Sequence, residues 1–127
     1  FFLDKSISNL KSLEKAEIII TDNSSIVFEF MLIFKRPIIY IDYKEKIHNI
    51  DRNKIPILTI EEEFKTTFGN KLNINKLKNL ADLCEKLIKE NNVSSQLVDS
   101  FAKKYLSNLD HSASFAANYL TNKSKSN

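Results

Sequence analysis

Glycine is nearly absent from this sequence, which has one, Gly69, among 127 residues. A Rossmann glycine fingerprint and a Walker-type phosphate loop both need several glycines, because the backbone must come close to phosphate. Neither motif exists in this chain. If the protein binds phosphate, it must therefore do so with a different structural device.

Cysteine and long apolar runs are also scarce. Cys84 is the only cysteine, so neither an internal disulfide nor a site built from several thiolates is available, and we expect a reducing, cytoplasmic setting and no metal. On its helix Cys84 is expected to be a core residue. The longest apolar run, Ile26 to Phe34, contains Glu29 and is about half the roughly 20 residues that span a bilayer, so no membrane-spanning helix is predicted.

The charge is nearly balanced and carries no strong bias. Lys and Arg number 19 against 16 Asp and Glu, a net charge of +3, and the basic residues are scattered. This distribution does not favour nucleic acid as a partner. A hydrophobic content of 43% fits one domain or part of one. Because the chain opens on Phe1-Phe2-Leu3 without an initiator Met, we expect a fragment of a longer protein.

Helical and strand patterns alternate through the first part of the chain. The apolar spacing predicts a helix over 6–15 with Ser6 as its N-cap, a strand over 17–21, a helix over 25–35 and a strand over 37–41. The β-branched run Ile18-Ile19-Ile20 is typical of a parallel strand buried on both faces. Pro37 marks the end of the second helix. This alternation predicts an α/β fold, a parallel sheet covered by helices.

The second part of the chain reads as mainly helical. Residues 42–54 have no clean period and are expected to form a loop, whereas 55–59 is predicted as a short edge strand. Thr59 is expected to cap a brief helix with an acidic first turn. Three further helices are predicted from apolar residues that share a face: Leu77, Leu80, Cys84, Leu87 and Ile88, then Val98, Phe101 and Tyr105, then Phe115, Tyr119 and Leu120.

We therefore expect one partial domain in three stretches. An α/β core spans 1–60, a helical C-terminal segment spans 61–122, and a tail spans 123–127. The tail is rich in Ser, Asn and Lys, a composition that rarely packs at a chain end.

The polar segment Asp22-Asn23-Ser24-Ser25 lies where the first predicted strand ends and a helix begins. Ligands of open α/β sheets bind outside the carboxyl ends of the strands. A helix N-terminus offers unpaired N–H groups and a positive dipole end, so it can hold an anion without glycine. Ser24 and Ser25 would add hydroxyl donors. The alternative is that these residues are simply N-caps that start the helix with no ligand.

Glu29 is the solitary acid in the apolar run that follows. A capping-box acid lies three residues after the cap, whereas Glu29 lies four after Ser25, on the same face and about 6 Å further along. This is roughly the step from the phosphates of a nucleotide to its ribose hydroxyls, so Ser25 and Glu29 form one candidate site. Alternatively, Glu29 pairs with Lys35, Arg36 or another cation, or points to solvent.

These residues resemble the C-terminal domain of the CDP-glycerol glycerophosphotransferases, which make teichoic acids and related surface polymers. The resemblance is carried by Ala16 to Asp22, Ser24-Ser25, Phe28-Glu29-Phe30 and Pro37 to Tyr40, and by Asp110 to Ser114, which is similar to a closing Asp-Gly-x-Ala-Ser segment. Three positions depart from the pattern: Asn23 stands for a Tyr, Arg36 for a Lys and His111 for a Gly. Because Asn23 stands where the family has Tyr, the identity of the donor stays open; related surface-polysaccharide transferases and sugar-nucleotide epimerases share the fold.

The resemblance implies a GT-B transferase, two Rossmann-like domains with the donor nucleotide between them, of which this chain is the later part of the C-terminal one. Asp22, Ser24 and Ser25 would face the donor diphosphate, and Glu29 the ribose. The implied donor is CDP-glycerol or another nucleotide-diphospho compound, with no cofactor. The implied partners are the missing N-terminal domain and a polymer or lipid-linked acceptor, at the inner face of the cell membrane.

The resemblance also implies that the catalytic base is a histidine from outside this chain. His48 and His111 are not assigned that role, so no catalytic residue is expected in the chain and the chain alone is expected to be inactive. Two other functions remain open, a sugar-nucleotide 2-epimerase on the same fold and a non-catalytic flavodoxin-like interaction domain.

Overall fold

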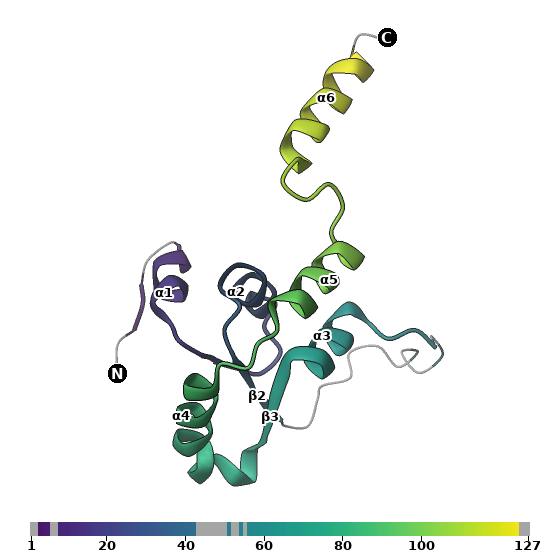
Figure 1. Ribbon diagram of the computed structural model, residues 1–127. Helices are drawn as coiled ribbons and strands as arrows, with labels where there is room; N and C mark the ends of the chain where they lie inside the picture. The colour runs from purple at the N-terminus through teal and green to yellow at the C-terminus, as the bar shows by residue number, and fades with distance from the viewer. Residues whose placement is uncertain (1–2, 6–7, 43–50, 52–53, 55, 125–127) are drawn as a thin grey trace. The chain divides into compact units, whose positions relative to one another are not determined.

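The computed structural model describes residues 3–5, 8–42, 51, 54 and 56–124 (Figure 1). The chain divides into two compact units, Phe1–Ser94 and Ser95–Asn127. The sheet and the helices that adjoin it belong to the first unit, and the last two helices make up the second.

The first unit is built on a parallel sheet. Its strands are β1 (Ile19–Thr21), β2 (Ile38–Asp42) and β3 (Gly69–Asn73), in the order β1-β2-β3. Ile20 pairs with Ile39, and Ile39 pairs with Asn70 on the other side. Strands β2 and β3 lie side by side in Figure 1. The α/β fold and the parallel sheet predicted from the sequence are confirmed.

The third strand is not where the sequence predicted it. Residues 56–59 form no strand, so the prediction of a strand over 55–59 is wrong for that described part; Ile55 lies outside the described residues. The strand is instead Gly69–Asn73, GNKLN, inside the segment expected to be helical. Gly and Asn are depleted in strands. Pairing with β2 holds the segment extended, and the Asn70 side chain adds a 3.1 Å hydrogen bond to the carbonyl of Ile38.

The core of the first unit comes from its central strand and the adjoining helices. Phe30, Met31, Ile38, Ile39 and Phe64 are fully buried. The central strand β2 is buried at Ile38, Ile39 and Tyr40. The prediction of burial on both faces is wrong for β1, where Ile20 is 44% exposed. The reason is that β1 lies at an edge of the described sheet, where a side chain has fewer neighbours.

Helix α1 (Leu10–Lys15) is shorter than predicted. It begins after Asn9 and buries Leu13, whereas the predicted cap, Ser6, lies outside the described residues. Its C-terminal end is held by Arg36, whose guanidinium donates 2.7 Å hydrogen bonds to the carbonyls of Glu14 and Ala16. Arg36 therefore binds the backbone at the end of α1, which ties α1 to the segment before β2.

Helix α2 (Ile26–Phe34) follows the prediction closely. Ser25 occupies its N-cap position, and it ends at Lys35 in the left-handed conformation, two residues before Pro37. The backbone N–H of Lys35 donates to the carbonyl of Met31. The apolar run Ile26 to Phe34 thus forms one helix, and proline sets its limit.

Helix α3 (Ile60–Phe68) begins with a complete capping box. Thr59 Oγ1 accepts a 3.3 Å hydrogen bond from the Glu62 backbone N–H, and Glu62 Oε2 accepts a 3.1 Å hydrogen bond from the Thr59 backbone N–H. Two N–H groups that would lack a partner at the helix start are satisfied in this way. The predicted cap at Thr59 is confirmed.

Replacing Thr59 with alanine is expected to lower the free energy of unfolding by about 1 kcal/mol, because the Glu62 N–H loses its acceptor. Thr67→Ala is a matched control, since Thr67 lies inside α3 and its hydroxyl donates to the Glu63 carbonyl. Alanine favours a helix interior, so the control should not be destabilised. Urea unfolding followed by circular dichroism measures both variants. Equal stability of T59A and wild type would contradict the role of the capping box.

The remaining helices are η2 (Ile74–Asn79), α4 (Leu80–Glu90), α5 (Ser95–Tyr105) and α6 (Ser112–Ser124). The predicted apolar face is partly buried on α4, at Leu80, Cys84, Leu87 and Ile88, although Cys84 was expected in the core. The prediction is wrong for Leu77, which lies in η2 and is 45% exposed. Val98 and Phe101 are the buried residues of α5. None of the described helices combines the length and apolar character needed to cross a membrane.

The prediction for α6 is right about the helix and wrong about its face. Phe115, Tyr119 and Leu120 were expected to point inward, but they are 57%, 57% and 66% exposed. Apolar spacing shows which face of a helix would be buried, and burial then requires an element to cover that face. Within Ser95–Ser124 nothing covers it, since every residue of α6 is exposed.

Candidate functional site

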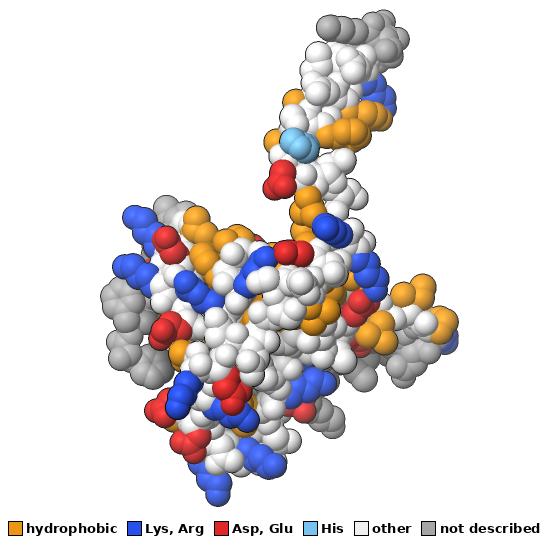
Figure 2. All heavy atoms as spheres, in the orientation of Figure 1, with side chains coloured by type: hydrophobic (Ala, Val, Ile, Leu, Met, Phe, Trp, Pro, Cys, Tyr) orange, Lys and Arg blue, Asp and Glu red, His pale blue; other side chains and the backbone are white. Residues whose placement is uncertain are grey.

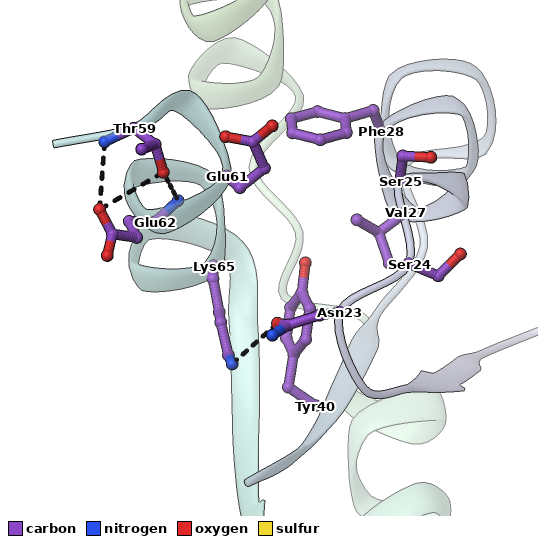
Figure 3. Close-up of a pocket in the computed structure, with 10 residues that line it drawn as sticks. All are labelled: Asn23, Ser24, Ser25, Val27, Phe28, Tyr40, Thr59, Glu61, Glu62 and Lys65. Atoms are coloured by element: carbon purple, nitrogen blue, oxygen red, sulfur yellow. Dashed lines mark hydrogen bonds between the residues drawn. The ribbon is translucent and has the colours of Figure 1, made fainter. Parts of the chain in front are cut away.

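A pocket of about 430 Å³ opens beside the start of α2. It lies at the point where β1 ends, and its other wall comes from α3 and from Tyr40 on β2 (Figure 3). Its lining consists of Asn23, Ser24, Ser25, Val27, Phe28, Tyr40, Thr59, Glu61, Glu62 and Lys65. The pocket therefore joins the polar segment identified in the sequence to a helix 35 or more residues further along.

Ser24 and Ser25 line the pocket at the N-terminus of α2. The Ser24 hydroxyl oxygen accepts a long, 3.4 Å hydrogen bond from the Ile26 backbone N–H, and the Ser25 side chain makes no capping hydrogen bond. Both residues are exposed. Capping therefore engages Ser24 weakly and leaves the Ser25 hydroxyl to other partners, which is the arrangement an anion site at a helix end needs.

Asp22 and Glu29 do not line the pocket. Asp22 Oδ1 accepts a 2.6 Å hydrogen bond from the Asn23 backbone N–H in the turn after β1. Glu29 is exposed, and within the described residues its side chain has no hydrogen bond or ion pair. The structure thus brings together Ser24 and Ser25 of the four predicted residues, while Glu29 points to solvent one turn further along α2. A ligand role for all four remains a prediction.

Of the ten residues that line the pocket, the sequence analysis assigned only Ser24 and Ser25 to a site. Three of the others, Asn23, Tyr40 and Lys65, lie together in the structure. The Lys65 ammonium donates a 3.2 Å hydrogen bond to Asn23 Oδ1, across 42 residues of sequence. The same nitrogen lies 5.2 Å from the centroid of the Tyr40 ring, within range of a cation–π contact. No spacing pattern in the sequence connects these residues, because their proximity arises from the packing of α3 beside β2.

Tyr40 supplies a neutral donor to the pocket. Its side chain is buried in the sheet, and burial raises the pKa of Tyr40 to about 12. The ionised phenolate would be poorly solvated there, so the protonated form is favoured. At neutral pH the phenol therefore keeps its proton and is able to donate a hydrogen bond.

The carboxylates of the pocket have different surroundings. Glu62 is held in the capping box with Thr59. Glu61 is exposed, and Figure 3 shows it directed toward Phe28, whereas Lys65 is directed toward Asn23. Among the residues that the structure describes, no cluster of three or more His, Cys, Asp or Glu side chains is arranged to hold a metal. The Lys65 ammonium and the Tyr40 phenol are thus donors on the side of Asn23, whereas Figure 3 shows the hydroxyls of Ser24 and Ser25 directed away from Lys65.

The two histidines do not contribute to this pocket as described. His48 lies outside the described residues, and His111 is exposed immediately before α6. Figure 2 shows Lys and Arg side chains interspersed with Asp and Glu over the visible face of the molecule. This mixture agrees with the scattered charges of the sequence.

The model of the CDP-glycerol:poly(glycerophosphate) glycerophosphotransferase family matches residues 4–116. The chain belongs to this family. The match includes the whole first unit apart from its first three residues, and with it the pocket. The resemblance drawn from Ala16 to Tyr40 and from Asp110 to Ser114 is confirmed, and the chain is a member of a transferase family. No curated protein and no solved structure matches the chain.

Proposed function

We propose that the chain is the donor-binding part of a glycerophosphotransferase that builds a surface polymer, and that the pocket beside α2 binds a nucleotide-diphospho donor such as CDP-glycerol. One observation supports this proposal above all. In a chain of this transferase family, a pocket of about 430 Å³ is lined by two serines at the N-terminus of a nine-residue helix that follows a parallel strand. This is the position at which α/β sheets bind phosphorylated ligands.

In the proposed complex, the hydroxyls of Ser24 and Ser25 and the N–H groups at the start of α2 bind the diphosphate. Asp22 orders the turn through its hydrogen bond to the Asn23 N–H. Glu29 lies outside the pocket lining, exposed one helical turn after Ser25, and accepts hydrogen bonds from the ribose hydroxyls of a donor that extends out of the pocket along α2. Charged hydrogen bonds of this kind contribute about 1.5–3 kcal/mol each.

The proposed reaction is an in-line displacement at phosphorus. An acceptor hydroxyl, on a polymer or a lipid-linked primer, attacks the glycerol-bearing phosphorus. A new O–P bond forms, the bond to the nucleotide oxygen breaks, and a nucleoside monophosphate leaves. Negative charge grows on the departing nucleotide, and the α2 N-terminus with its serines stabilises it there. The acceptor proton goes to a histidine of the other GT-B domain, so this chain alone does not turn over substrate. The site of action is the inner face of the cell membrane.

Calorimetric titration with CDP-glycerol, CDP and UDP tests the donor site. We expect wild type to bind at least one diphosphate, and the double variant Ser24→Ala with Ser25→Ala to bind it at least about tenfold more weakly, which is 1.4 kcal/mol. Glu29→Gln should weaken nucleotide binding but leave inorganic pyrophosphate binding unchanged. Ser100→Ala, exposed on α5, is the control.

Two results would contradict the proposal. If wild type binds none of the three nucleotides, an interaction domain with structural caps is the better interpretation. If it binds UDP but neither CDP compound, a sugar-nucleotide 2-epimerase is the better interpretation.

A further inference from the structure

We propose that Lys65 is a specificity-determining residue of this pocket: its ammonium contacts the phosphoryl oxygens of the donor and makes the pocket prefer a nucleoside diphosphate over a monophosphate. This inference rests on the proposed function. It adds to that function a residue that lies on α3, outside the polar segment and the helix that follows it.

Two contacts of the Lys65 ammonium place it at the wall of the pocket. Its Nζ donates a 3.2 Å hydrogen bond to Asn23 Oδ1 and lies 5.2 Å from the centroid of the Tyr40 ring. An amide oxygen and an aromatic ring both attract an ammonium without carrying a formal charge. Both contacts place the ammonium at the pocket wall, close to the loop that leads into α2.

Asn23 is followed in the chain by the two serines proposed to bind phosphate, Ser24 and Ser25. Asn23 and Ser24 are adjacent in the chain, so an ammonium bound to Asn23 lies beside the loop that leads into α2. A diphosphate extending from the helix N-terminus along this loop would meet Lys65 with its second phosphoryl group. A monophosphate bound at the helix end would leave that contact unmade.

The charges that line the pocket also favour a diphosphate that extends toward Lys65. Lys65 is the single Lys or Arg among the described residues that line it. The Glu62 carboxylate is engaged by the backbone and hydroxyl of Thr59, and Glu61 is directed toward Phe28 at the other end (Figure 3). Repulsion by Glu61 and attraction by Lys65 both favour placing the phosphates near Asn23.

A purely structural role for Lys65 makes a different prediction. If Lys65 only links α3 to the loop after β1, its removal lowers stability and weakens all ligands alike. If Lys65 binds phosphate, the affinity that its removal costs depends on the number of phosphates in the ligand. The remaining binding then also depends less steeply on salt concentration. The two roles are therefore separated by comparing ligands that differ only in phosphate.

The experiment measures binding of CDP, CMP and cytidine to the full chain by calorimetry, or of UDP, UMP and uridine if wild type binds UDP. Lys65→Met keeps the apolar stem and removes the charge, Lys65→Arg keeps the charge, and Lys86→Met, exposed on α4, is the control. We expect Lys65→Met to lose about tenfold in diphosphate affinity and little in nucleoside affinity. Lys65→Arg should recover most of the loss, and Lys86→Met should behave as wild type.

Thermal unfolding of every variant shows whether it is folded, and Lys65→Gln replaces Lys65→Met if the latter is not. If Lys65→Met loses the same affinity for diphosphate and nucleoside, or loses affinity for neither, the proposed role of Lys65 is wrong. The donor site itself would still stand if the serine double variant binds the diphosphate more weakly than wild type. Absence of nucleotide binding by wild type would overturn the proposed function, and this inference with it.

Discussion

Replacing Phe64 with alanine is expected to lower the free energy of unfolding by about 3–5 kcal/mol, the usual cost of removing a large buried ring. Phe64 is fully buried. Its ring centroid lies 4.4 Å from that of Phe28 and 4.9 Å from that of Phe68. The truncation leaves a cavity between α2 and α3, whose neighbours lose dispersion contacts as well as burial.

Loss of the Phe64 ring should also weaken binding of the donor. Phe28 lines the pocket and packs on Phe64, so the variant should also bind the donor more weakly under conditions where it remains folded. Chemical denaturation and calorimetry measure the two effects. Phe115→Ala is the matched control, since Phe115 is 57% exposed and surface substitutions change stability by about 0.5 kcal/mol or less. A loss below about 1 kcal/mol in Phe64→Ala would show that this packing does not stabilise the fold.

Replacing Gly69 with alanine is expected to lower the free energy of unfolding by roughly 1–3 kcal/mol. The backbone of Gly69, with φ of −85° and ψ of 132°, is one that any residue adopts, so the cost comes from space. An added Cβ would lie 2.5 Å from the Lys65 carbonyl oxygen and 2.5 Å from Cδ2 of Tyr40. Backbone and a buried ring would both have to move.

Gly69→Ala should also disturb the pocket, because Tyr40 and Lys65 both line it. We expect weaker binding of the donor nucleotide together with the stability loss, measured by calorimetry and by urea unfolding. Lys71→Ala is the control on the same strand, since Lys71 is exposed. If Gly69→Ala matches wild type in both measurements, the strand and the Tyr40 ring shift without cost, and the close approach at Gly69 is not required.

Features that depend on neighbours in sequence were predicted well. The limits of α2 follow from the apolar run, the polar segment before it and Pro37 after it. The start of α3 follows from Thr59 and Glu62, because a capping box closes within four residues. The family was also visible in the motif from Ala16 to Tyr40 and is confirmed by the match over residues 4–116.

Features that depend on distant partners were not predicted. Strand β3 has a sequence that disfavours strands, and only β2 beside it holds it extended. The exposed face of α6 had the spacing of a buried one. In the site, Ser24 and Ser25 were predicted from the sequence, whereas the opposite wall of the pocket, with Tyr40 and Lys65, was not.

The sequence by itself thus determined the α/β alternation, the start of α2 with its two serines, and the family. Hydrophobic period, capping and proline act over a few residues, so one stretch of chain contains all the information they need. The tertiary structure decided which segment completes the sheet, which way Glu29 points, and that Lys65 meets Asn23 across 42 residues. Those outcomes depend on which surfaces pack together, and no local pattern encodes that choice.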